Sequence, residues 1–285
     1  MMVERVADIA VTGSTGAVGG RVARILSDAS VRQRLPVRDV SRAPVLPGGA
    51  TVRAEYGDRE SAESALSGVR VLFMVSATET ENRLHQQHTF IDAAADAGVE
   101  HIVYTSFFGA SEDATFTFAR EHWATEEYIR ASGLGYTFLR NNFYQDIMPL
   151  WAGDDGVIRG PGGSGRMAAV ARDDVAAVAA AVLQDPDGHR GATYNLTGPE
   201  SLTFAEIADA LGEATSRQVR FHNESVDEAY ESRKKWDAPP WQYDAWVSTY
   251  TAVGKGELDG VTQDVEKVTG SAPLSLSDFL AGSSR

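Results

Sequence analysis

The sequence contains no cysteine among its 285 residues. That absence excludes disulfides, thiolate nucleophiles and cysteine-ligated metals, and it fits a cytoplasmic protein. No apolar run approaches the roughly 20 residues that a membrane-spanning helix needs, and the first residues lack the pattern of a secretion signal. Basic residues are scarce, with 26 Lys and Arg against 40 Asp and Glu, so the formal net charge is −14. Because no basic patch is segregated in the sequence, we expect no nucleic-acid partner and no membrane partner.

What the chain does have is a glycine-rich stretch near its start, Asp8 to Gly20. The apolar run Ile9 to Val11 leads into Gly13, Gly16 and Gly19, and apolar residues then recur at helical spacing. Gly13 permits a backbone angle closed to other residues, Gly16 lets a pyrophosphate approach, and Gly19 lets the helix pack on the strand. The N-terminus of that helix attracts phosphates. The pattern predicts a dinucleotide-binding loop, and the alternative is an ordinary glycine-rich turn.

Strands and helices alternate along the first half of the chain. The nearly continuous apolar run at 69–75 is typical of a central parallel strand that is buried on both faces. The alternation predicts an α/β fold, a doubly wound parallel sheet of the Rossmann type with a smaller, irregular C-terminal α/β lobe. We expect strands at 5–11, 34–40, 50–54, 69–75, 101–105 and 136–140, and helices at 17–27, 58–66, 82–97 and 116–132.

The regularity weakens after Arg140, where Gly and Asp become frequent at 153–165. We expect residues 1–150 to form the dinucleotide-binding domain, with 166–198 returning to it, and 151–165 and 199–285 to form a substrate or lid lobe. A capping box at Thr203 and Glu206 predicts a helix start. Further elements are expected as strands at 167–170, 192–196 and 218–221 and helices at 173–183 and 203–211.

Arg38 follows the second predicted strand, about 20 residues past the glycines, where dinucleotide folds meet the adenosine ribose. A basic residue there tolerates the 2′-phosphate of NADP, whereas an acidic one binds the 2′-hydroxyl of NAD. Arg42 lies four residues further on, and Asp39, next to Arg38, keeps NAD possible as the cofactor. The sequence therefore favours NADP(H) over NAD(H), with no flavin; the alternative is that both arginines are solvated loop charges.

The Tyr-x-x-x-Lys pair of short-chain dehydrogenases lowers the pKa of its tyrosine for proton transfer. Its one match, Tyr230 to Lys234, lies far in sequence from the fifth strand and is interpreted as chance. His122 lies on the helix expected to pass near a nicotinamide, and it either donates a proton to the reduced substrate, hydrogen-bonds it, or is structural. His85 and His88 have no third ligand, so no metal site is expected.

Polar amides beside aromatics follow the sixth predicted strand, in Arg140-Asn141-Asn142-Phe143-Tyr144. Doubly wound sheets bind ligands at this end of their strands, so the segment could hold a nicotinamide ring and a flat acceptor. The alternative is a helix start with both aromatics in the core. With His122, this segment supplies the candidate catalytic residues His122, Asn142 and Tyr144.

Five segments together resemble the NmrA-like atypical short-chain dehydrogenase/reductases, and among them the bacterial NAD(P)H:quinone oxidoreductases of type 2. They are TGSTGAVG, Tyr56-Gly57-Asp58 preceded by Glu55, GVEHIVYTS, the H-x-x-T-E helix and LRNNFY. The resemblance covers nearly the whole chain. Asn142 replaces a glycine common in the family, and Pro36 departs from the usual aliphatic second strand.

The resemblance implies NADPH on the glycine loop, with Arg38 at the 2′-phosphate and 142–147 beside the nicotinamide. The expected cofactor contacts are Gly13, Ser14, Thr15, Gly16, Ala17, Val18, Gly19, Arg38, Ser76, Ala77, Asn142, Phe143, Tyr144 and Arg172.

Two functions follow from this resemblance. The first is an enzyme that passes hydride from NADPH to a quinone or similar electron-poor small molecule without a Tyr-Lys pair, because a hydroquinone anion is stabilised and water or His122 can supply the proton. The second is a non-catalytic NADP(H) sensor that regulates a partner. A homodimer is compatible with either.

Overall fold

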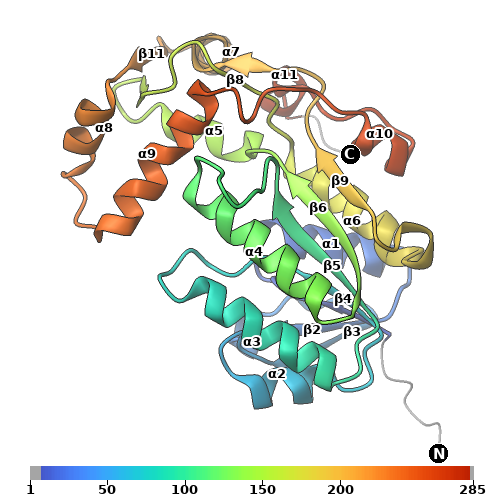
Figure 1. The fold of residues 1–285 in the computed structure, drawn as a ribbon. Helices are drawn as coiled ribbons and strands as arrows, with labels where there is room; N and C mark the ends of the chain where they lie inside the picture. The colour runs from blue at the N-terminus through green and yellow to red at the C-terminus, as the bar shows by residue number, and fades with distance from the viewer. Residues whose placement is uncertain (1–7, 283–285) are drawn as a thin grey trace, which may run out of the picture. The chain divides into compact units, whose positions relative to one another are not determined.

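The computed structural model describes residues 8–282 and contains a seven-stranded sheet in the order β3-β2-β1-β4-β5-β6-β9 (Figure 1). Its strands run parallel, which confirms the predicted doubly wound sheet. Residues 5–7, expected to begin the first strand, lie outside the described residues. The strands are Ile9–Val11 (β1), Gln33–Val37 (β2), Gly49–Arg53 (β3), Val71–Met74 (β4), His101–Phe107 (β5), Gly135–Asn141 (β6) and Thr193–Leu196 (β9).

The chain divides into two compact units. The first comprises the chain up to Ser106 together with Ala124–Leu139 and Val175–Tyr194. The second comprises Phe107–Trp123, Arg140–Asp174 and the chain from Asn195 onward. All five tryptophans of the sequence fall within the second unit.

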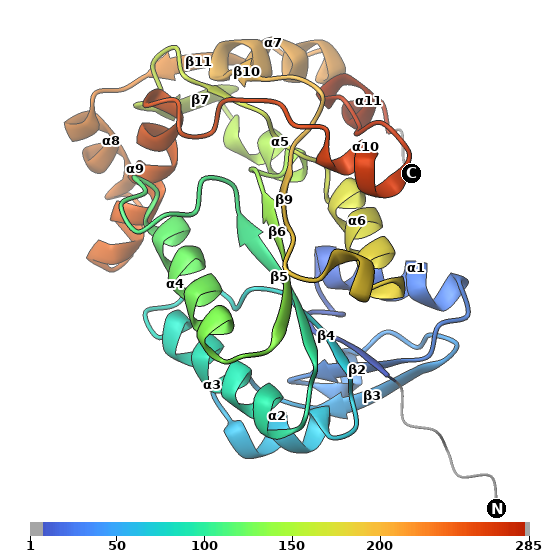
Figure 2. The same ribbon diagram turned by 45° about the vertical axis from the view of Figure 1, so that its right-hand side comes forward.

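Helices cover both faces of the sheet (Figure 2). On one face lie α2 (Arg59–Leu66), α3 (Arg83–Asp96) and α4 (Thr117–Ala131), and on the other lie α1 (Ala17–Asp28) and α6 (Arg172–Gln184). Because helices lie on both faces, all four residues of β4 are buried, and this explains the continuous apolar run at 69–75.

Pro36 lies within β2 although proline has no N–H to donate. Strand β1 pairs with β2 at Gln33 and Arg34, whereas Pro36 lies opposite Val52 of β3. The proline therefore follows the part of β2 that pairs with β1, and the five-residue strand forms despite its weak propensity.

The second unit is more helical than the sequence indicated. The sequence analysis assigned no elements after 221, and the structure has four helices between Val226 and Leu280, of which α9 and α11 contribute to an aromatic-rich core. Two small sheets accompany the helices, β7 with β11 in parallel and β8 with β10 antiparallel. The elements are α5 (Met148–Trp151), β7 (Val157–Gly160), β8 (Arg166–Met167), β10 (Leu202–Thr203), α7 (Phe204–Thr215), β11 (Arg220–Asn223), α8 (Val226–Arg233), α9 (Pro240–Gly254), α10 (Asp264–Thr269) and α11 (Leu276–Leu280).

Capping boxes begin two of these helices. The predicted box at Thr203 and Glu206 is confirmed at the start of α7. A second box, Ser225 with Glu228, begins α8 and was a readable signal that the sequence analysis missed. The strand expected at 167–170 is shorter than predicted: β8 ends at Met167, and Val170 instead forms an isolated bridge with Tyr144.

Across residues 8–282, no helix combines the length and apolar character needed to cross a bilayer.

Candidate functional site

The glycine loop has the geometry that its sequence predicts. Gly13 has a φ of +64°, in the left-handed region that favours glycine. A Cβ on Gly19 would lie 2.4 Å from the carbonyl oxygens of Thr12 and Gly13, so the start of α1 touches the turn after β1. A Cβ on Gly16 would lie 3.2 Å from the Gly13 oxygen. Gly13 and Gly19 are therefore required by the backbone itself.

The donors of this loop fit the phosphates of a dinucleotide. Ser14 is 3% exposed, and its hydroxyl has no hydrogen-bond partner among residues 8–282. In the same described part of the chain, no side chain caps the N-terminus of α1, which begins after Gly16. Thr15, Gly16 and Ala17 are exposed, whereas Val18, in the first turn of α1, is buried. Free amides, a helix N-terminus and a spare hydroxyl form a typical anion site.

Tyr56, which the sequence analysis named only as part of the motif Tyr56-Gly57-Asp58, stabilises this loop. The Tyr56 hydroxyl donates to the Val75 carbonyl at 2.5 Å and lies 2.7 Å from the Thr12 hydroxyl. Thr12 in turn accepts the Val75 N–H at 2.9 Å. The Tyr56 ring stacks on Phe90 of α3, and burial raises the pKa of its hydroxyl well above the usual range. Neutral Tyr56 therefore ties the turn after β1 to the end of β4.

Ser76 and Ala77, which follow β4, are held by buried polar side chains. The Ser76 N–H donates to the Thr105 hydroxyl at 2.8 Å, and the Ala77 N–H donates to the side-chain oxygen Oε1 of Gln87 at 3.2 Å. Arg83, which is 2% exposed, donates to the Ala77 carbonyl at 3.0 Å. Because β1 and β4 are adjacent strands, this segment lies beside the glycine loop, as the predicted cofactor site requires.

Arg38 and Asp39 follow β2 and differ in their availability. Arg38 is exposed. Asp39 caps the short turn Val40–Arg42, and its Oδ1 accepts the N–H and the hydroxyl of Ser41 at 2.9 and 2.6 Å. These hydrogen bonds lower the pKa of the Asp39 carboxyl. Asp39, the acidic residue that made NAD a possible cofactor, is thus hydrogen-bonded within its own turn.

The other predicted residues belong to the second unit: His122, Asn142, Phe143, Tyr144 and Arg172. Asn142 is 1% exposed, and both its side-chain oxygen and its side-chain nitrogen are hydrogen-bonded. Its Oδ1 accepts the Phe143 N–H at 2.8 Å, and its Nδ2 donates to the Leu258 carbonyl at 3.0 Å. Asn142 therefore fixes the chain after β6 to a distant segment.

Tyr144 lies against a charged pair. The Arg172 guanidinium carbon is 4.7 Å from the centre of the Tyr144 ring, and Arg172 lies 3.9 Å from the Asp146 carboxylate. The Asp146 carboxylate also accepts the Arg172 N–H at 3.0 Å. Burial raises the pKa of the Tyr144 hydroxyl, which accepts a hydrogen bond from Asn141 Nδ2 at 3.2 Å. The contact between Tyr144 and Arg172 brings together two residues predicted separately.

His122 is 7% exposed, and its ring centre lies 6.1 Å from that of Phe107. Phe107 contacts Phe143 and Phe116, with ring centres 5.1 and 4.9 Å apart. The chain of rings continues through Phe118 to Trp241 of α9. His122 thus lies beside Phe107, at one end of an aromatic cluster in the core of the second unit.

The dipeptide Glu257-Leu258 links the segments that carry these residues. The Glu257 carboxylate accepts the N–H of Thr115 at 2.9 Å and also its hydroxyl, while the Lys255 ammonium donates to Thr115 Oγ1 at 2.9 Å. The Leu258 carbonyl accepts from Asn142. The loop before α4 and the segment after β6 are therefore held by neighbouring residues, which sequence analysis missed because the partners lie more than 100 positions away.

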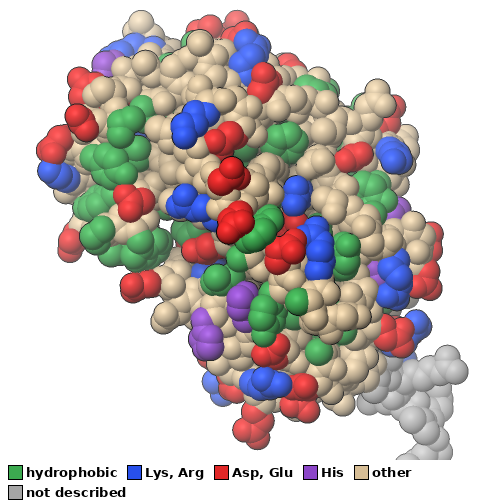
Figure 3. All heavy atoms as spheres, viewed as in Figure 1, with side chains coloured by type: hydrophobic (Ala, Val, Ile, Leu, Met, Phe, Trp, Pro, Cys, Tyr) green, Lys and Arg blue, Asp and Glu red, His purple; other side chains and the backbone are tan. Residues whose placement is uncertain are grey.

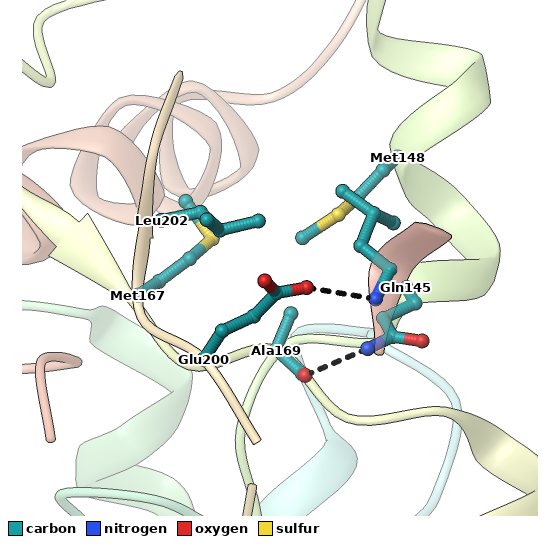
Figure 4. A pocket seen from close by; sticks show the side chains of 7 residues that line it. Gln145, Met148, Met167, Ala169, Glu200 and Leu202 are labelled. Atoms are coloured by element: carbon teal, nitrogen blue, oxygen red, sulfur yellow. Dashed lines mark hydrogen bonds between the residues drawn. The ribbon is translucent and has the colours of Figure 1, made fainter. Parts of the chain in front are cut away.

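A small pocket of the second unit lies beside this region (Figure 4). It is lined by Gln145, Met148, Met167, Ala169, Glu200, Leu202 and Leu276. Two hydrogen bonds hold its wall, from Gln145 Nε2 to the Ala169 carbonyl and from the Leu276 N–H to Glu200. Its space is close to that of one water molecule, so it holds neither a nucleotide nor a quinone.

The remaining sequence candidates have ordinary surroundings. Tyr230 donates to Asp244 at 2.7 Å and Lys234 pairs with Glu231, so each has its own partner. The His88 ring stacks on Tyr128 with centres 3.8 Å apart. Within 8–282, no three His, Cys, Asp or Glu side chains gather to hold a metal. On the face in Figure 3, Lys and Arg are interspersed with Asp and Glu.

Comparison with known proteins places this geometry in a family. The model of the NmrA-like family matches residues 6–233. Quinone oxidoreductase 2 of Escherichia coli is 33% identical over 96% of this chain and 97% of its own, and the NAD(P)H azoreductase of Xenophilus azovorans is 30% identical over 95% and 96%. The crystal structure of the Escherichia coli NADPH-dependent quinone oxidoreductase complexed with NADPH has a TM-score of 0.86 and 31% identity, over 96% of this chain and 99% of its own. The chain belongs to the NmrA-like family.

Proposed function

We propose that the protein is an NADP(H)-dependent oxidoreductase that reduces a quinone or a similarly electron-poor small molecule. The observation that carries the proposal is the glycine loop. Among residues 8–282, the Ser14 hydroxyl has no hydrogen-bond partner and no side chain caps the start of α1, so both can donate to a pyrophosphate. Relatives of similar length, named as a quinone oxidoreductase and an azoreductase, support an oxidoreductase role.

Unit 1 supplies the groups that would hold the cofactor. Ser14 and the amides at the start of α1 bind the phosphates, and the braced segment at Ser76 and Ala77 lies beside them. Exposed Arg38 favours the 2′-phosphate of NADP(H), because the neighbouring Asp39 is committed to Ser41. NADPH supplies a hydride when it is bound.

Unit 2 supplies the groups that would handle the acceptor. Phe107 lies beside the His122 ring and packs on Phe143, so aromatic side chains adjoin the residue that we propose to contact the acceptor. Orientation of two flat rings accounts for much of the rate in such a reaction, so a dedicated tyrosine acid is not required. His122 or water donates the proton that the reduced acceptor needs, while Asn142 holds the segment carrying Phe143 and Tyr144 in place.

The proposal is tested by turnover. We expect the purified protein to oxidise NADPH when a small benzoquinone is added, followed by the loss of NADPH absorbance. An NADPH control without quinone should stay unchanged. Tight NADPH binding with no turnover on any quinone would contradict the enzyme and favour the nucleotide sensor.

Cofactor choice has its own test. Arg38→Ala should weaken NADPH binding by about 10- to 100-fold, because a charge-assisted contact to the 2′-phosphate is lost. NADH binding should change little, since NADH lacks that phosphate. Calorimetric titration of both cofactors measures the difference, with Arg42→Ala as the control on the same turn. Equal weakening of both cofactors, or no change in either, contradicts the role of Arg38.

A further inference from the structure

Tyr56 closes a ring of hydrogen bonds where β1 runs into the glycine loop. Its hydroxyl lies 2.5 Å from the Val75 carbonyl oxygen and 2.7 Å from Thr12 Oγ1, and the Val75 N–H donates to the same Oγ1 at 2.9 Å. Tyr56 and Thr12 bring one hydroxyl proton each. Both short contacts of Tyr56 are satisfied only when Tyr56 donates to Val75 and Thr12 donates to Tyr56, so the ring has a single direction.

The groups of this ring are committed to one another. The Phe73 carbonyl, which lies 3.1 Å from the Thr12 hydroxyl, already accepts the Thr12 N–H at 3.0 Å. Thr12 is 1% exposed, so its hydroxyl serves the surrounding protein. The Tyr56 ring stacks on Phe90 of α3 with ring centres 4.2 Å apart, and this contact fixes the direction of its hydroxyl.

The ring adjoins the turn that offers donors to the phosphates. Gly13 follows Thr12, and a Cβ on Gly13 would lie 3.1 Å from the Val75 side chain, so Val75 packs directly against the turn. Ser14, whose hydroxyl has no hydrogen-bond partner among residues 8–282, comes next along the chain. The separation between this turn and the end of β4 therefore determines where the Ser14 hydroxyl and the first amides of α1 lie.

We propose that Tyr56 is a positioning residue that preorganises the glycine loop for a pyrophosphate, through the hydrogen-bond ring that it forms with Thr12 and Val75. A loop that is ordered before the ligand arrives lowers the ordering cost of binding. This inference rests on the proposed function, because it takes the glycine loop as the phosphate site. It requires that the Tyr56 hydroxyl affect ligands that carry a pyrophosphate and not ligands that lack one.

The test compares NADPH with 2′-AMP, which carries the adenosine and the 2′-phosphate but no pyrophosphate. Tyr56→Phe keeps the aromatic ring that stacks on Phe90 and removes only the hydroxyl. We expect this variant to bind NADPH about 10-fold more weakly, because binding must then order the loop without that hydrogen bond, and to bind 2′-AMP unchanged. Calorimetry measures NADPH directly and 2′-AMP by competition with NADPH.

Tyr128→Phe is the matched control in the same unit. Its hydroxyl donates to Asp92 of α3 at 2.9 Å, so its removal should leave both dissociation constants unchanged. A double-variant cycle adds a second readout on NADPH alone. Thr12→Val opens the same ring, so the double variant with Tyr56→Phe should bind NADPH no more weakly than Thr12→Val by itself.

Unchanged NADPH affinity in Tyr56→Phe overturns the role of Tyr56 and leaves the proposed function intact. Equal weakening of NADPH and 2′-AMP overturns it as well, since a general loss of structure acts on both ligands. Losses that multiply in the double variant contradict a shared ring. If the unmodified protein binds neither nucleotide, the proposed function fails together with this inference.

Discussion

Gly19→Ala is expected to weaken NADPH binding by about 100-fold. The added Cβ would lie 2.4 Å from the carbonyl oxygens of Thr12 and Gly13, which are backbone atoms and cannot turn aside as a side chain could. The start of α1 must therefore move away from the turn after β1. Such overpacking costs up to about 3 kcal/mol and carries the phosphate-binding amides out of position. Calorimetric titration with NADPH measures the loss.

Gly57→Ala is the matched control in the same unit. A Cβ there would lie 3.5 Å from the Gln86 side chain, an ordinary contact, so NADPH affinity should be unchanged. If Gly19→Ala binds NADPH as tightly as the unmodified protein, then the close approach of α1 to the turn does not shape the nucleotide site.

Arg233→Met is expected to destabilise the second unit by about 3 to 5 kcal/mol, because it leaves a buried carboxylate without a partner. The Arg233 guanidinium lies 2.9 Å from Glu224, and their side chains are 7% and 4% exposed. Arg233 also donates to the Arg159 carbonyl at 3.1 Å and lies over the Tyr250 ring. Removal of the arginine therefore strands the Glu224 charge inside the apolar surroundings of α8 and α9. Denaturant unfolding measures the change.

Replacing both charged residues distinguishes the cost of leaving one buried charge unpaired from the contribution of the ion pair itself. The double variant Glu224→Leu with Arg233→Met should recover most of the lost stability, since no unpaired charge stays buried. Lys234→Met, which removes an exposed pair with Glu231, should change the free energy of unfolding by less than about 1 kcal/mol. A double variant as unstable as Arg233→Met would assign the loss to packing around Tyr250 rather than to the charge.

The sheet and the backbone geometry of the glycine loop could be predicted because their signals are local. The continuous apolar run at β4 indicated a strand covered on both faces. The glycine that follows α3, Gly98, has a φ of +82°, as the C-terminal end of a helix often requires. The glycine loop needed only the order strand, turn and helix. Each of these signals depends on residues within one element and its immediate neighbours.

The second unit and the finer site could not be predicted because their contacts join distant residues. Tyr56 braces Thr12 across 44 positions, and Glu257 holds Thr115 across 142. No periodicity records such pairs. The sequence likewise presents Asn141 and Asn142 as equivalent, and only their hydrogen-bond partners distinguish them.

The placement of the tryptophans has an optical consequence. Since all five indoles belong to the second unit, intrinsic fluorescence excited near the red edge of their absorption follows that unit alone. A melt recorded in this way does not report directly on the first unit, whose aromatic emitters are tyrosines such as Tyr56 and Tyr104. Circular dichroism in the far ultraviolet records both units, so a difference between the two melting curves would separate the unfolding of one from the other.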